Sequence, residues 1–179
     1  MKQTFATLLV ATALGLAAHP CRAQSWPDPP PNLVQATPGI HTSGQPSAKS
    51  LAGLKAQGFE AVVYLAPPTV GDAVPEEAKI VGGQGLVFVN IPIVFDNPTE
   101  RDFETFVAVM KALSGRKVLV HCQVNLRASS MTFLYRAIVG KENPDEAWKA
   151  VEKIWTPRGA WKRLIEEQLK KHGVAFEIF

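Results

Sequence analysis

Apolar and polar residues follow two different rhythms along this chain. Short, nearly continuous apolar runs at 60–65, 85–93 and 117–120 are typical of strands that are buried on both faces. The segment 99–113 instead repeats its apolar residues every three or four positions, as one face of a helix does. The repeating residues are Phe103, Phe106, Val107, Met110 and Leu113. The chain therefore alternates between strand patterns and helix patterns.

This alternation predicts the order of the elements. Strands are expected over 39–43, 60–65, 85–93 and 117–120. Helices are expected over 46–57, 75–81, 99–113, 128–139, 144–155 and 158–172. Strands separated by helices predict an α/β fold with a mostly parallel central sheet and helices on both faces. The length fits a single domain, which we place at 39–179.

The first 23 residues have the composition of a secretory signal peptide. Lys2 precedes an apolar run from about residue 5 to 18, and the small residue Ala23 ends the segment. The apolar run is short for a bilayer span, which takes ~20 residues, so an uncleaved anchor is the weaker alternative. We expect cleavage after Ala23 and a periplasmic or secreted protein. Residues 24–38 are rich in proline and are expected to form an extended leader.

The net charge and the cysteine content limit the kinds of function that the sequence suggests. The chain has 19 basic and 16 acidic residues, and loss of the signal removes Lys2 and Arg22 but no acid, so the net charge falls from +3 to +1. A nearly neutral protein gives no electrostatic reason to expect nucleic acid or membrane binding. Cys21 leaves with the signal, and Cys122 remains alone. A lone cysteine is either a small buried hydrophobe or a thiol kept for chemistry.

Cys122 stands where α/β sheets bind their ligands, beyond the carboxyl end of a strand. The turn that follows has free backbone N–H groups and leads into a helix near residue 128. Such N–H groups and a helix N-terminus stabilise bound anions and also a thiolate. Arg127 adds a planar guanidinium that suits phosphate or sulfate oxygens. The residues alone therefore indicate a nucleophile held in an oxyanion-binding loop.

These motifs resemble the cysteine-dependent protein tyrosine and dual-specificity phosphatases over most of the mature chain. VLVHC at 118–122 is similar to the family's strand and His-Cys start, and IPIVFDNPT at 91–99 looks like its general-acid loop. The helix pattern at 143–155 resembles the family's late helix. The SGQPS segment at 43–47, with Gly58 and the strand over 62–65, is similar to small bacterial members of the superfamily. The resemblance implies the phosphatase-like variant of the α/β fold.

The resemblance also implies a role for each residue of the site. Cys122 would attack phosphorus as a thiolate and form a phosphocysteine. Asp96 would protonate the leaving oxygen and then activate water. The phosphate would be bound by the loop that follows the cysteine, which comprises Gln123, Val124, Asn125, Leu126 and Arg127.

Asp96 has competitors with simpler explanations. Thr99 fits a helix N-cap, and Glu100 and Asp102 are acids of a first helical turn. Asp96 itself could be a turn former ahead of Asn97.

The loop is one residue shorter than the family signature, because four residues instead of five separate Cys122 from Arg127. With a gap, Arg127 is the family arginine. Without one, Asn125 takes the usual glycine place, Ala128 the arginine place and Ser129 the hydroxyl place. We favour the ungapped backbone, with Arg127 reaching in from a neighbouring position, because asparagine tolerates the left-handed conformation that the glycine place often requires.

Two side chains have expected supporting roles. His121 would shape the loop and tune the thiolate, a role close to that of a satisfied core histidine. Ser129 would either hydrogen-bond the thiolate or serve as an ordinary serine of a first helical turn. His41 and His172 have no partners at metal-ligand spacing, so no metal and no cofactor are expected.

Two alternatives to an active phosphatase stay open. Rhodanese-type sulfurtransferases have four residues between cysteine and arginine and carry sulfur as a persulfide, which matches the loop length here but not the rest of the sequence. A catalytically weak module that binds oxyanions without turnover is the other. The favoured phosphatase would act on a phosphorylated protein or a small phosphoester.

Overall fold

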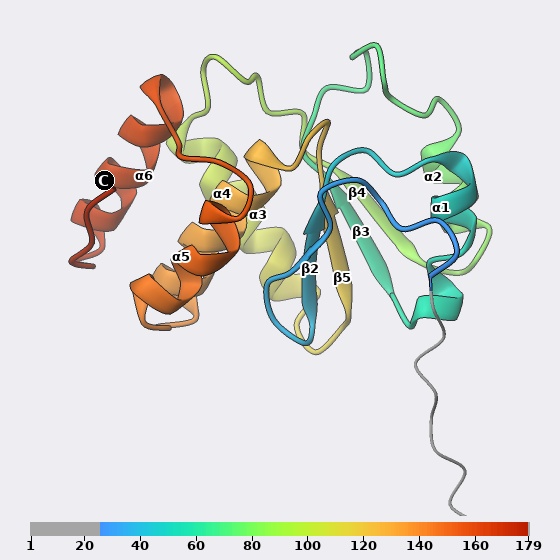
Figure 1. Cartoon of the computed structure of the whole chain (residues 1–179), viewed down its shortest axis with the longest axis horizontal. Coiled ribbons are helices and arrows are strands. Elements are labelled where there is room, and N and C mark those ends of the chain that lie inside the picture. Colours follow the sequence, from blue (N-terminus) through green and yellow to red (C-terminus); the bar gives the residue numbers. More distant parts are fainter. Residues whose placement is uncertain (1–25, 179) are drawn as a thin grey trace, which may run out of the picture.

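The computed structural model describes residues 26–178, so the expected signal peptide lies outside the described residues. Five strands form one sheet in the order β1-β2-β5-β3-β4 (Figure 1). Their bounds are Val34–Gln35, Ile40–Ser43, Ala61–Tyr64, Val87–Asn90 and Val118–His121 for β1 to β5. β2, β5, β3 and β4 pair in parallel, and β1 pairs antiparallel with β2. The predicted α/β class with a mostly parallel sheet is confirmed.

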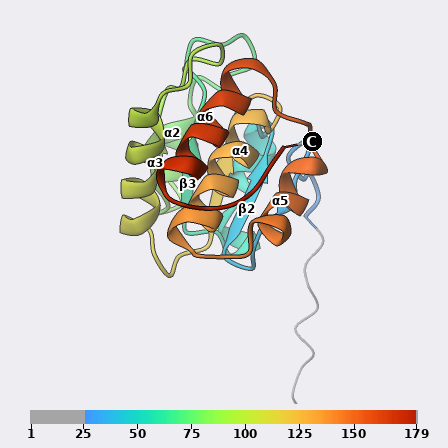
Figure 2. The ribbon, with the colours of Figure 1, turned by 90° about the vertical axis from the view of Figure 1, so that its left-hand side faces the viewer.

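Helices cover both faces of the sheet, as predicted. On one side lie α1 (Ala48–Ala52), a short 3-10 turn (Lys55–Gln57) and α2 (Glu77–Gly82) (Figure 1). On the other side lie α3 (Glu100–Ala112), α4 (Leu126–Leu134), α5 (Pro144–Glu152) and α6 (Gly159–Lys171), with the sheet behind them in Figure 2. A π-helical turn (Tyr135–Val139) continues α4. Within residues 26–178, no helix is both long enough and apolar enough to cross a membrane.

The central strand β5 contributes to both hydrophobic cores, which explains its continuous apolar run. Val118 and Val120 join the larger core under α3 to α6, whereas Leu119 joins the smaller core under α1 and α2. Every residue of β5 is buried. A strand in this position has no solvent face, so no polar alternation appears in its sequence.

Local signals place the start of α3 correctly. The Thr99 hydroxyl accepts a hydrogen bond from the Asp102 N–H, and the Asp102 carboxylate accepts one from the Thr99 N–H. A cap of this kind contributes ~1 kcal/mol to the stability of a helix. The cap therefore also fixes where the preceding loop, 91–98, must end.

The leader expected over 24–38 is partly a structural element. Within it, Val34 and Gln35 form β1 and pair with β2 at Thr42 and His41. Trp26 and Leu33 pack against the smaller core. The domain therefore begins before residue 39, and a two-residue strand is too short to show the alternation that would have predicted it.

His41 on β2 makes the stability of the fold depend on pH. Burial, and secondarily the positive charge of Lys117, lower the pKa of His41 from 6.5 to about 4. Between these two values the folded protein keeps His41 neutral while the unfolded chain protonates it, so stability falls as the pH drops through this window.

The free energy of unfolding should fall when the pH is lowered from 7.5 to 5. We expect this fall to be smaller in His41→Gln than in the natural protein, by on the order of 1–2 kcal/mol. Urea denaturation at the two pH values measures this loss. The exposed His172 supplies the control, and an equal effect of His172→Gln would contradict the assignment to His41.

Candidate active site

Cys122 follows directly after β5, and the strands on either side hold this strand end. Its N–H donates to the carbonyl of Ser43, the last residue of β2, at 3.2 Å. The carbonyl of His121 accepts from the N–H of Leu65, the residue after β3, at 2.8 Å. The thiol is free and fully buried. The nucleophile predicted from the sequence therefore lies at the carboxyl edge of the sheet.

The chain turns from Cys122 into α4 within three residues, because Asn125 adopts the predicted left-handed conformation, with φ 76°. The Asn125 amide fixes this turn by donating to the carbonyl of Asn32 at 2.7 Å and to the hydroxyl of Thr42 at 3.1 Å. Within the described residues, the backbone N–H groups of Gln123 and Val124 donate no hydrogen bond. The first N–H groups of a helix also lack carbonyl partners, so this loop offers several donors to an anion.

Arg127 lies in the first turn of α4 and reaches across to the loop 91–98. Its Nε donates to the carbonyl of Ile93 at 3.0 Å, and its guanidinium lies over the ring of Phe95, 5.0 Å from the centroid. Its Nη1 lies 3.4 Å from Oε1 of Gln123. Only 5% of Arg127 is exposed. One guanidinium therefore joins the cysteine loop to the expected general-acid loop.

The loop 91–98 packs against Trp161 of α6 and against Trp155, which lies between α5 and α6. The expected strand over 85–93 ends at Asn90, whose side-chain amide donates to the carbonyl of Tyr64. Beyond this point, Trp161 Nε1 donates to the carbonyl of Phe95 at 2.9 Å. The Phe95 ring lies about equally far from Trp155 and Trp161, with centroids 6.1 and 6.0 Å away. The aromatic cluster thus supports the residue next to Asp96.

Asp96 is exposed and lines an open hollow of about 350 Å³ with Trp155, Arg158 and Arg163. Within residues 26–178 its carboxylate makes no hydrogen bond and no ion pair. The nearby acids are engaged elsewhere, since Asp102 caps α3 and Glu100 contacts Lys171. Among these described acids, Asp96 is therefore the one whose carboxylate has no hydrogen-bond or ion-pair partner.

Ser129 takes the simpler of its two expected roles. Its hydroxyl donates to the carbonyl of Asn125 at 2.7 Å, and no hydrogen bond joins it to Cys122 in the described part of the chain. Such bonding to the preceding turn is ordinary for a serine inside a helix.

Two acidic residues of this region, Asp72 and Glu77, were not predicted from the sequence. Asp72 accepts from Nε2 of Gln123 at 2.9 Å, and the buried Glu77 lies between His121 and Gln45. No motif surrounds Asp72 or Glu77, and an acid in a first helical turn usually needs no functional explanation. Their positions follow from the packing of α2 and its preceding loop against the end of β5.

The charges around Cys122 also affect Tyr64, whose ring stacks on His121 with centroids 4.7 Å apart. Burial raises the pKa of Tyr64 to about 12, and the negative charges of Glu77 and Asp72 add to this effect. Tyr64 is therefore a neutral phenol at physiological pH.

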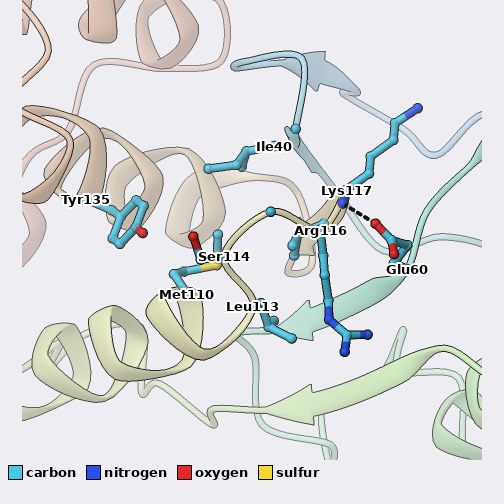
Figure 3. A pocket seen from close by; sticks show the side chains of 11 residues that line it. Ile40, Glu60, Met110, Leu113, Ser114, Arg116, Lys117 and Tyr135 are labelled. Atoms are coloured by element: carbon cyan, nitrogen blue, oxygen red, sulfur yellow. Dashed lines mark hydrogen bonds between the residues drawn. The ribbon is translucent and has the colours of Figure 1, made fainter.

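A separate cavity of about 380 Å³ lies at the opposite edge of the sheet, beside the starts of β2 and β5 (Figure 3). Its rim includes Arg116, Lys117 and Tyr135, and the backbone N–H of Lys117 donates to the carboxylate of Glu60 at 3.0 Å. Cys122 lies at the other end of β5, so this cavity takes no part in the thiol site. Among the described residues, no group of three or more His, Cys, Asp or Glu side chains could hold a metal ion.

Comparison with known proteins identifies relatives of the chain. Residues 35–167 match the family model described as DSP-PTPase phosphatase fused to NAD+ kinase. The solved structure of a DUF442 protein from Shewanella putrefaciens CN-32 has 33% sequence identity and a TM-score of 0.75, covering 81% of this chain and 93% of that one. No curated protein matches the sequence.

More distant structures share the fold. Tk-PTP in its active form is 21% identical with a TM-score of 0.62, covering 79% of this chain and 95% of that one. The core catalytic domain of the PP-IP phosphatase SIW14 from S. cerevisiae is 15% identical with a TM-score of 0.62, covering 77% and 85%.

The left-handed turn at Asn125 can be tested by paired substitutions. Asn125→Gly and Asn125→Ala both lose the side-chain hydrogen bonds, but alanine also bears the strain of a positive φ. We expect the alanine variant to be less stable by about 1 kcal/mol in urea denaturation. At Asn97, which does not have a positive φ, we expect the glycine variant to be the less stable of the two. The same order at both sites would contradict this role of Asn125.

Proposed function

Because the chain belongs to the family described as DSP-PTPase phosphatase fused to NAD+ kinase, within the cysteine-dependent phosphatases, we propose that it hydrolyses phosphomonoesters through Cys122. One observation carries this proposal above the others. Arg127 connects the loop after Cys122 to the loop that contains Asp96, through Gln123 on one side and Ile93 on the other. We therefore infer that a nucleophile, an anion-binding loop and an acid act together at one edge of the sheet, and the contacts of Arg127 support this by joining the two loops.

In the first step, the thiolate of Cys122 attacks phosphorus and forms a sulfur–phosphorus bond while the bond to the leaving oxygen breaks. Asp96 gives its proton to that oxygen, so the product leaves as a neutral alcohol. In the second step, Asp96 takes a proton from water, which attacks phosphorus and releases the thiolate and inorganic phosphate.

Arg127 and the loop N–H groups stabilise the charge on the phosphoryl oxygens during both steps. Nη1 of Arg127 is held only by a long contact with Gln123, so an incoming oxyanion readily takes its place. Nε remains on the carbonyl of Ile93 and keeps the guanidinium oriented. This division of donors supports the proposal that an arginine displaced by one residue from the usual spacing serves the site.

The rim of the site favours an aromatic phosphoester. Val94 and Val124 are 58% and 50% exposed, and each belongs to one of the two loops that Arg127 joins. Exposed apolar side chains beside an anion site suit a substrate that has a ring next to its phosphate. A related structure, TpbA from P. aeruginosa, was solved in complex with pTyr, and SIW14 is a PP-IP phosphatase. Phosphotyrosine and aryl phosphates are therefore the first substrates to test.

The proposed enzyme acts outside the cytoplasm, on the strength of the signal-like pattern of residues 1–23. We expect N-terminal sequencing of the protein from a periplasmic fraction to begin at Gln24. A mature protein that still begins at Met1 would contradict export by cleavage.

We expect hydrolysis of an aryl phosphate near pH ~5.5, where a thiolate and a protonated aspartate can coexist. Cys122→Ser should reduce turnover by about 10³-fold or more, and Asp96→Asn by about 10²-fold, because each removes one partner of the reaction. Glu152→Gln, an exposed substitution at the end of α5, should leave turnover unchanged. Full activity of the Cys122→Ser variant would refute the proposal.

The same preparation separates the alternatives. Reduced protein that does not hydrolyse the aryl phosphate but gains one sulfur atom on Cys122 after thiosulfate, seen by mass spectrometry, is a sulfurtransferase. Protein that does neither, but whose Tm rises with phosphate or vanadate, is an oxyanion-binding module.

A further inference from the structure

Glu77 is a buried acid that the proposed reaction does not use. It is the first residue of α2, and its side chain is only 4% exposed. Each carboxylate oxygen has its own partner. Oε1 lies 2.6 Å from Nε2 of His121, and Oε2 accepts a hydrogen bond from the side-chain amide of Gln45 at 3.0 Å. A carboxylate is costly to bury, so such complete pairing points to a role at this place.

The first partner holds the residue before the nucleophile. His121 is fully buried, stacked on Tyr64 and bonded through Nε2 to Glu77. Its other ring nitrogen, Nδ1, is buried without a hydrogen-bond partner in the described residues. A hydrogen on Nδ1 would be buried and unsatisfied, so the ring is best placed with its hydrogen on Nε2, directed at Glu77. The carboxylate therefore sets both the orientation and the tautomer of His121.

The second partner holds the residue after the nucleophile. The backbone N–H of Gln45 donates to the carbonyl of Gln123 at 2.9 Å, while its side chain donates to Glu77. Gly44, next to Gln45, approaches the same carbonyl so closely that an added Cβ would lie 2.8 Å from it. Glu77 therefore reaches Gln123 through a single intervening residue.

We propose that Glu77 is a positioning residue that clamps the chain on both sides of Cys122, through His121 before it and through Gln45 and Gln123 after it. This rests on the proposed role of Cys122 as the nucleophile. By fixing both neighbours, Glu77 keeps the thiol and the loop N–H groups in the arrangement that stabilises the thiolate.

The pH midpoint of thiolate formation at Cys122 distinguishes this positioning role from a simple effect of the Glu77 charge, because the two shift the midpoint in opposite directions. Thiolate formation can be followed by the absorbance of the thiolate near 240 nm as the pH is raised, with the matching Cys122→Ser protein as the blank. Removing the negative charge of Glu77 would by itself favour the thiolate and lower the pH midpoint. Loss of positioning would instead raise it. The other charged or titratable groups that the site contains are the same in all variants compared, and they are Arg127, Asp72, Asp96, His121 and Tyr64.

We expect Glu77→Gln to raise the midpoint by about one pH unit and to lower kcat about tenfold with little change in KM. Glu76→Gln is the matched control, because Glu76 is the preceding residue and is exposed. It should leave both the midpoint and the rate as in the natural protein. Circular dichroism and Tm establish that each variant is folded.

Gln45→Ala is the second test, because it cuts one arm of the clamp without changing any charge and leaves the buried pair of Glu77 and His121 intact. We expect a smaller shift in the same upward direction. An unchanged or lowered midpoint in both variants would overturn the inference. The absorbance does not depend on turnover, so a protein without phosphatase activity would refute the proposed function and still test the clamp.

Discussion

The site depends on the way β5 is enclosed in the sheet. β5 is hydrogen-bonded to β2 on one side and to β3 on the other, and its two faces contribute to different cores. A strand enclosed in this way cannot shift without breaking both ladders and exposing apolar surface. Its end at His121 is therefore held in place, and so are Cys122 and the start of the loop that follows it. A reactive group on a rigid element can be held more accurately than one on a free loop.

The other half of the site depends on contacts that cross the whole domain. The loop that carries Asp96 has no regular structure, yet Arg127 binds it from α4 and Trp161 binds it from α6. The last helix thus positions a residue that precedes it by more than sixty positions. The Phe95 ring contacts Arg127, Trp155 and Trp161. These contacts depend on one another, because a shift of the ring would disturb all of them.

Several local rules are broken around Cys122, as is common where function competes with stability. Asn125 has a positive φ, Arg127 lies buried in a first helical turn whose dipole disfavours a cation, and Glu77 is buried. Each exception has a compensating partner. Asn32 and Thr42 hold Asn125, Ile93 and Phe95 hold Arg127, and His121 and Gln45 hold Glu77. An anion bound between the loop and Arg127 would compensate the remaining positive charge.

The sequence by itself determined the features that depend on neighbouring residues. Buried strands leave continuous apolar runs, amphipathic helices leave a three- and four-residue rhythm, and Thr99 and Asp102 mark the start of α3. The position of Cys122 at a strand end and the turn at Asn125 followed from the same local signals. Only the tertiary structure decided the rest. Glu77 meets both His121 and Gln45 because α2 packs beside the end of β5, and β1 forms because it pairs with β2. Contacts between residues more than thirty positions apart are set by how the layers pack, and no periodicity along the chain records them.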